Sequence, residues 1–234
     1  MQNYCKTIGA LAAASALVAG TAKAEIEHSI NGGYHNEYLF RGIQQGGDMV
    51  TTGYDIAGGT SMFDLSAGVW HADYDTSGGN LTETDVYGEV GYDLGFAEAA
   101  LGYIYYIYDD SPNPTDDAQE VYFGLSRELG YGIGASLTYF WDIETDNEGY
   151  MELALDKSYE LTDCLSLGLA TALGYAWEEG EVANWMTTAT LDWAFAEGAT
   201  LSPYLLYVVD GESSFYETSS EQELVGGVNL IVNF

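Results

Sequence analysis

Apolar and polar residues alternate along most of the chain with a period of two. From Gly132 to Ile143 every second residue is apolar, and the positions between them are mostly small or polar; Thr82–Leu94 and Leu165–Trp177 follow the same rule. A period of two places one set of side chains on each face of a β-sheet, whereas helical spacing would mix the two sets. The pattern therefore predicts strands with one apolar face.

Two kinds of connection separate these strands. Short turns are expected near Met62, Gly95, Tyr131, Thr162 and Glu197, at spacings of about 31 to 36 residues. Between them lie polar stretches that we predict to be longer loops: Arg41–Asp48, Asp75–Thr82, Asp109–Ala118, Ile143–Gly149, Glu178–Ala183 and Asp210–Glu221. Six hairpins follow, which predict an all-β fold, a closed antiparallel transmembrane barrel of twelve strands of the bacterial outer-membrane type. A secreted β-sandwich also has short alternating strands, but it would not divide into a lipid-like and a carboxylate-rich face.

The N-terminal segment has the features of an export signal. Lys6 precedes the apolar run Ile8–Gly20, and Ala22–Ala24 forms an A-x-A cleavage site. A membrane-spanning helix needs about 20 apolar residues, more than this run offers. We predict a signal peptide at 1–24 and a barrel at 25–234, located in the outer membrane of a Gram-negative cell.

Aromatic residues near the predicted strand ends fit the same fold. On the apolar parity they resemble the girdles that mark the edges of the membrane, although a carbohydrate-stacking or core cluster is the alternative. The residues concerned are Trp141, Trp177, Trp185, Trp193, Tyr139, Tyr175 and Phe195. The terminal Phe234 is typical of the signal that the barrel assembly machinery reads. Expected partners are that machinery, outer-membrane lipid and lipopolysaccharide.

The charge balance excludes one class of partner and suggests another. Lys and Arg together number 5 against 37 Asp and Glu, for a formal net charge of −32, so no nucleic-acid partner is expected. Strand carboxylates fall on the non-apolar parity, and a lumen lined by them would concentrate small cations, with neutral solutes also passing. A saline habitat or general solubility is the alternative cause. The lumen and selectivity candidates are Arg41, Glu37, Asp55, Glu83, Asp85, Glu89, Asp93, Glu120, Glu128, Asp142, Glu152, Asp156, Asp192 and Glu223.

The first strand and loop resemble a known family. The run from Asn36 to Gln45, NEYLFRGIQQ, is similar to the S-x-Y-x-F-R-G-x-S-Q hallmark of the TorF-type porin family, a Gram-negative outer-membrane family of largely unassigned function. Tyr54-Asp55 and Phe63–Trp70 resemble its second and third strands. Gln44 and Asn36 depart from the hallmark serines. The resemblance implies an outer-membrane barrel and, for solutes, no more than a porin.

Arg41 is the only fixed cation on the predicted lumen parity, where the first strand meets its loop. A guanidinium there needs carboxylate partners, and Glu37 on the same strand face and Asp55 across the hairpin are the nearest candidates. A structural ion pair that holds the first loop is favoured over direct contact with a solute.

No pattern in the sequence indicates an enzyme, a metal site or a cofactor. The segment from Asp142 begins like an EF-hand loop but has Asn147 where the loop needs Gly. His71 with Asp73 and Ser77 is the nearest approach to a catalytic set, without a lipase-like motif around it. Two functions stay open: a cation-preferring porin, and a closed-lumen barrel acting as a structural or adhesive surface protein.

Overall fold

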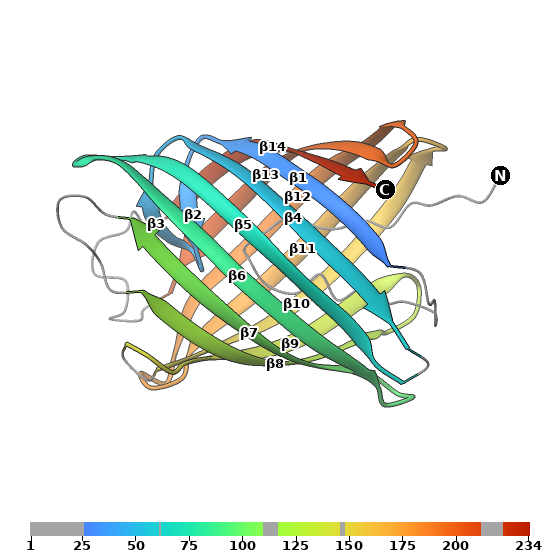
Figure 1. The fold of residues 1–234 in the computed structure, drawn as a ribbon, viewed down its shortest axis with the longest axis horizontal. Helices are drawn as coiled ribbons and strands as arrows, with labels where there is room; N and C mark the ends of the chain where they lie inside the picture. Colours follow the sequence, from blue (N-terminus) through green and yellow to red (C-terminus); the bar gives the residue numbers. More distant parts are fainter. Residues whose placement is uncertain (1–25, 61, 110–116, 146–147, 212–221) are drawn as a thin grey trace.

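Twelve long strands close into a barrel (Figure 1). The structure, a computed structural model, describes residues 26–60, 62–109, 117–145, 148–211 and 222–234, so the predicted signal peptide at 1–24 lies outside the described residues. The wall strands are β1 (Glu27–His35), β4 (Met49–Gly59), β5 (Asp64–Thr76), β6 (Gly79–Asp93), β7 (Glu98–Asp109), β8 (Ala118–Glu128), β9 (Ile133–Asp142), β10 (Gly149–Thr162), β11 (Leu165–Ala176), β12 (Glu181–Ala196), β13 (Ala199–Asp210) and β14 (Gln222–Asn233).

Each wall strand pairs antiparallel with both of its neighbours. β1 closes the barrel, pairing with β14 through Ser29 and Asn233 and with β4 through Glu27 and Ala57. Closure leaves no unpaired sheet edge, which a strand within lipid requires. The predicted closed barrel of twelve antiparallel strands is confirmed. Among the described residues, no helix is long and apolar enough to cross a membrane.

The two faces of the wall differ as the alternation predicts. Leu137, Leu153 and Leu173 are cross-strand neighbours on β9, β10 and β11, and 41%, 49% and 39% of their surfaces are exposed. The inward Thr138 and Ser166 are each only 5% exposed. Because the wall is a single layer, a buried side chain on it points into the barrel. The aromatics predicted as girdles lie on the exposed face: Trp141, Trp177, Trp185, Trp193 and Phe195 are all exposed, and Tyr139 and Tyr175 are partly so.

Two predicted loops are instead short turns. β11 ends at Ala176 and β12 begins at Glu181, so the expected loop Glu178–Ala183 is a turn of four residues; the other case lies between β5 and β6. β5 continues to Thr76 and β6 begins at Gly79, so the expected loop Asp75–Thr82 is wrong. The Thr76 hydroxyl accepts a hydrogen bond from Gly78 N at 3.1 Å and donates to Gly79 O at 2.7 Å. Gly79 has φ 124°. Polar residues that resembled a loop in composition therefore hold a two-residue turn.

The predicted loop Arg41–Asp48 forms a hairpin of its own. β2 (Tyr38–Phe40) pairs with β3 (Ile43–Gly46) in a separate two-stranded sheet. Figure 1 shows it at the end of the barrel remote from the end of β14. Arg41 and Gly42 connect the two strands with φ values of 51° and 81°, as a type I′ turn requires. We call residues 38–46 the inner hairpin.

The inner hairpin is the common element of three hydrophobic clusters inside the barrel. Tyr38 packs with Met49, Ala72 and Tyr74 from β4 and β5. Leu39 lies against a cluster from β12, β13 and β14: Met186, Tyr204, Leu206, Val208 and Val225. Phe40 and Ile43 pack on a third cluster: Ile104, Tyr106, Tyr122, Phe140, Tyr150, Ala176 and Ala183. The burial of these apolar side chains against three clusters thus stabilises the hairpin inside the barrel.

Candidate functional site in the barrel interior

The guanidinium of Arg41 binds the carboxylate of Glu120 on β8. Nη1 and Nη2 donate to Oε1 and Oε2, each at 2.7 Å, in the bidentate geometry that makes such pairs strong. Tyr106 on β7 donates its hydroxyl to Oε2 of Glu120 at 2.9 Å. Of the partners expected from the sequence, neither Glu37 nor Asp55 has a described contact with Arg41. The reason is that the chain leaves the wall after His35, and the hairpin carries Arg41 across the lumen.

Three aromatic rings surround the same guanidinium. Arg41 Cζ lies 4.7 Å from the ring centroid of Phe40, 4.6 Å from that of Phe140 and 4.7 Å from that of Tyr150. Cations over aromatic faces at this distance are attracted by the ring quadrupole. Burial alone would lower the pKa of Arg41, but the charge and hydrogen bonds of Glu120, together with the nearby Tyr106 and Tyr150, outweigh burial and raise the pKa above its ordinary value. Arg41 is therefore a fixed cation in a cage of rings and one carboxylate.

Further contacts fix the hairpin to several strands. Asn184 on β12 is fully buried and donates Nδ2 to the backbone oxygen of Arg41 at 2.6 Å. Tyr38 donates its hydroxyl to Glu83 on β6 at 2.8 Å. Before the hairpin, Asn36 N donates to Gly226 O at 3.0 Å, and after it Gly47 N donates to Asp75 O at 2.7 Å. The hairpin is thus tied to opposite sides of the wall.

Most of the interior carboxylates accept hydrogen bonds from neutral groups. Tyr122 donates to Glu89 at 2.8 Å, and Ser202 donates to Asp192 at 2.6 Å. Asp55 accepts from Tyr87, and from Asn31 Nδ2 at 2.9 Å. Such partners orient a carboxylate without cancelling its charge. Glu120 differs from these carboxylates, because it forms an ion pair with Arg41.

Glu83, Asp85 and Glu120 come together beside the hairpin. As whole residues, they are 2%, 1% and 6% exposed. Oδ1 of Asp85 has no hydrogen-bond partner among the described residues. Glu83, Asp85 and Glu120 with Arg41 thus form the most deeply buried charged group of the interior.

The other predicted lumen residues lie apart from this group. Glu152 and Glu223 are half-buried on β10 and β14, and Glu37 precedes the hairpin and accepts a hydrogen bond from Gln44. Nearer the strand ends, Asp93 accepts from Gly95 N at 2.6 Å in the short turn after β6, and Asp142 accepts from Glu144 N at 2.9 Å after β9. Glu128 on β8 and Asp156 on β10 are exposed.

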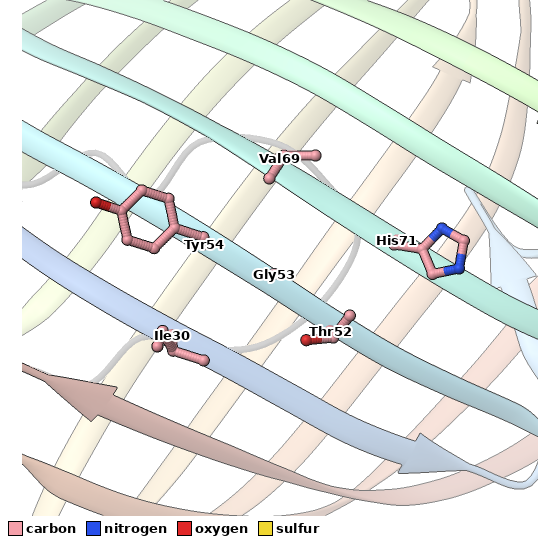
Figure 2. A pocket seen from close by; sticks show the side chains of 6 residues that line it. All are labelled: Ile30, Thr52, Gly53, Tyr54, Val69 and His71. Atoms are coloured by element: carbon pink, nitrogen blue, oxygen red, sulfur yellow. The ribbon is translucent and has the colours of Figure 1, made fainter.

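His71, the residue nearest to a catalytic candidate, lies on the outer face. With Ile30, Tyr54 and Val69 it lines a groove of about 310 Å³ across β1, β4 and β5. Figure 2 shows these side chains on the three strands. Nδ1 of His71 is 2.9 Å from the Thr84 hydroxyl. The groove holds none of the predicted lumen carboxylates.

The sequence did not reveal which residues contact Arg41. Phe140 and Tyr150 stand on the inward parity, Asn184 lies on β12, and Glu120 was one carboxylate among many. Two signals were present: Phe140 is a large ring on an otherwise small or polar parity, and Tyr38, Leu39 and Phe40 are consecutive and apolar, which a strand with one lipid face does not need.

The fold is shared with known outer-membrane barrels. The COG4313 outer membrane channel from Pseudomonas putida F1 superposes with a TM-score of 0.61 at 9% identity, over 95% of this chain and 100% of that one. The KdgM porin gives 0.55 at 12% identity, over 88% and 99%. The translocator domain of the autotransporter NalP from Neisseria meningitidis gives 0.50 at 13%, over 93% and 90%. These identities show the fold alone.

No protein-family model matches the chain, and neither does any curated protein. The TorF-type resemblance therefore stays a prediction. The similar structures include channels and a translocator, so the function has to be argued from this chain's own interior.

Proposed function

We propose that the chain is an outer-membrane diffusion channel whose acidic interior prefers small cations and also admits neutral solutes. The observation that carries the proposal is the hydrogen bonding of the interior carboxylates. Glu89, Asp55 and Asp192 accept from tyrosine, asparagine or serine groups, and only Arg41 supplies a paired positive charge in the described interior. An aqueous passage with such walls attracts cations and repels anions.

The inner hairpin would set the narrowest part of the passage. It is tied to β5, β6, β8 and β12 and packs on clusters from both sides of the wall. Glu128 and Asp156, toward the short-turn end, are exposed to solvent. Side chains at the short-turn end are therefore exposed to solvent, whereas the hairpin packs inside the barrel at the other end. The channel should for this reason pass only small solutes.

The same packing favours a second candidate, a closed barrel with a structural or adhesive role. Leu206, Val208 and Val225 point inward and are at most 2% exposed, and Leu39 covers them. A barrel of this strand number can be filled completely by side chains and inward segments. Conductance separates the two candidates.

The test is the full chain reconstituted in a planar bilayer under a potassium chloride gradient. We expect a reversal potential of the sign set by potassium, which shrinks at high ionic strength and as the pH falls toward the carboxylate range. A preference for chloride would overturn the cation proposal. Folded, heat-modifiable protein without conductance would support the closed barrel.

A further inference from the structure

A cavity of about 160 Å³ lies between the inner hairpin and the wall. The rings of Phe40, Tyr106, Tyr108 and Tyr150 line it, together with Glu120 and Glu148. All of these residues are described, and they come from the hairpin, from β7, β8 and β10, and from the turn before β10. The cavity is therefore built by rigid strands of the wall more than by loops.

The lining of the cavity combines aromatic rings with carboxylates. The lining carries the carboxylates of Glu120, Asp142 and Glu148 and the guanidinium of Arg41, so acidic side chains outnumber basic ones around the cavity. The rings of Tyr106 and Tyr108 are parallel to within 4° and 6.5 Å apart. Aromatic faces combined with negative charge select cations with an apolar surface over strongly hydrated metal ions.

One lining residue, Arg41, is itself a cation of this kind. The Arg41 guanidinium lies over three rings at 4.6–4.7 Å and on the Glu120 carboxylate at 2.7 Å. Three of those partners, Phe40, Tyr150 and Glu120, also line the empty space beside it. The wall therefore has the groups that hold a guanidinium, and Arg41 occupies only part of the space they enclose.

We propose that this cavity binds a small organic cation, a solute that carries a guanidinium or amine group, next to Arg41. The solute's charge lies on the side of the cavity that Glu148 and Asp142 line, and its apolar part lies on Tyr108. The carboxylate of Asp142 also accepts hydrogen bonds from Glu144 N at 2.9 Å and Thr145 N at 3.0 Å, so Glu148 carries the main contact. This site goes beyond the proposed channel function, because binding requires the cavity alone and not passage through the barrel.

The experiment measures binding of methylguanidinium to the detergent-folded full chain by saturation-transfer NMR, with methylammonium and the uncharged N-methylurea as companions. We expect saturable binding of the two cations and none of the urea. Tyr108→Leu and Glu148→Gln should each weaken binding by about tenfold, the size of one cation–ring or charge contact. Tyr103→Leu, on the outer face of the same strand, and Glu144→Gln, in the same turn, serve as controls and should bind as wild type.

A second variant makes the test independent of Tyr108. In Arg41→Ala the inner end of the cavity is vacated, so methylguanidinium should bind more tightly than to wild type and should restore part of the lost heat stability. Binding of the neutral urea equal to that of the cations, or equal weakening by Tyr108→Leu and Tyr103→Leu, would overturn the proposal. Because no step depends on conductance, a barrel that binds but does not conduct refutes only the channel, and one that conducts but does not bind refutes only this site.

Discussion

Arg41 and Glu120 are joined by two parallel hydrogen bonds of 2.7 Å, and they link the tip of the inner hairpin to the wall strand β8. Their side chains are only 15% and 8% exposed. Removal of one partner from a buried pair leaves the other charge without compensation, at a cost of about 3 to 5 kcal/mol. The pair is therefore a strong link between the tip of the hairpin and β8.

Arg41→Ala should lower the free energy of unfolding by about 3 kcal/mol, measured by urea titration of the detergent-folded barrel. Arg41→Lys should recover part of the loss, since an ammonium keeps the charge but not the bidentate geometry. The double variant Arg41→Ala/Glu120→Ala should be less destabilised than the sum of its single changes. Additive losses would show that the two side chains do not interact in solution.

Gly42→Ala tests how closely the turn of the hairpin approaches β12. A methyl group at Gly42 would lie 3.1 Å from Cβ of Asn184, and Asn184 is fully buried. Gly95 has nearly the same φ, 82° against 81°, but a methyl group there meets nothing within 4 Å. Gly95→Ala should therefore cost only the conformational penalty of about 1 kcal/mol, and Gly42→Ala clearly more in the same urea titration. Equal losses would mean that the hairpin does not rest against Asn184.

Leu153→Arg tests which face of the wall contacts lipid. Leu153 is 49% exposed on the outer face of β10, between Leu137 and Leu173. An arginine on the lipid face costs about 2–4 kcal/mol near the middle of the bilayer and about 0–1 kcal/mol near its edge. Leu161→Arg, eight residues further along the same face of the strand, is the control. Urea unfolding in lipid vesicles should show a large loss for the first and a small loss for the second; the reverse order would contradict this orientation.

The fold was predictable from the sequence because the wall follows one rule. Each strand has a lipid face and a lumen face, so a period of two identifies strands, as Leu137 and Thr138 illustrate. The inner hairpin does not follow that rule. Tyr38 and Leu39 pack on different parts of the wall, and Phe40 adds a third part while also packing beside Tyr38. The position of the hairpin therefore depends on partners far away in the sequence. No local pattern connects Arg41 to Glu120 or Asn184, so the interior site could not be read from spacing.

The pH dependence of stability should report on Glu37 at the foot of the hairpin. Partial burial, and then the charge of Glu223, raise the pKa of Glu37 above its ordinary value. The folded chain then holds this proton more tightly than the unfolded chain, so stability falls as the pH rises through the raised pKa. Urea unfolding between about pH 4 and about pH 7 should show that fall, and Glu37→Gln should reduce it. An unchanged slope in Glu37→Gln, or the same reduction in the exposed control Glu144→Gln, would contradict the assignment.

If the barrel conducts, Glu89 should contribute more to its selectivity than Glu128 does. Glu89 lies in the interior, where Tyr122 donates to it at 2.8 Å, and Glu128 is exposed near the end of β8. Glu89→Gln keeps a hydrogen-bond acceptor for Tyr122 and removes only the charge. A unit charge several ångströms away attracts a potassium ion and repels a chloride ion by about 0.5 kcal/mol each through water, so the ratio of potassium to chloride permeability should fall by up to about fivefold. Glu128→Gln should change it less, because bulk water and salt screen an exposed charge. Reversal potentials of the two variants in the same salt gradient measure these two contributions to selectivity. A larger effect at Glu128 would contradict the prediction and place the selective part of the passage at the short-turn end.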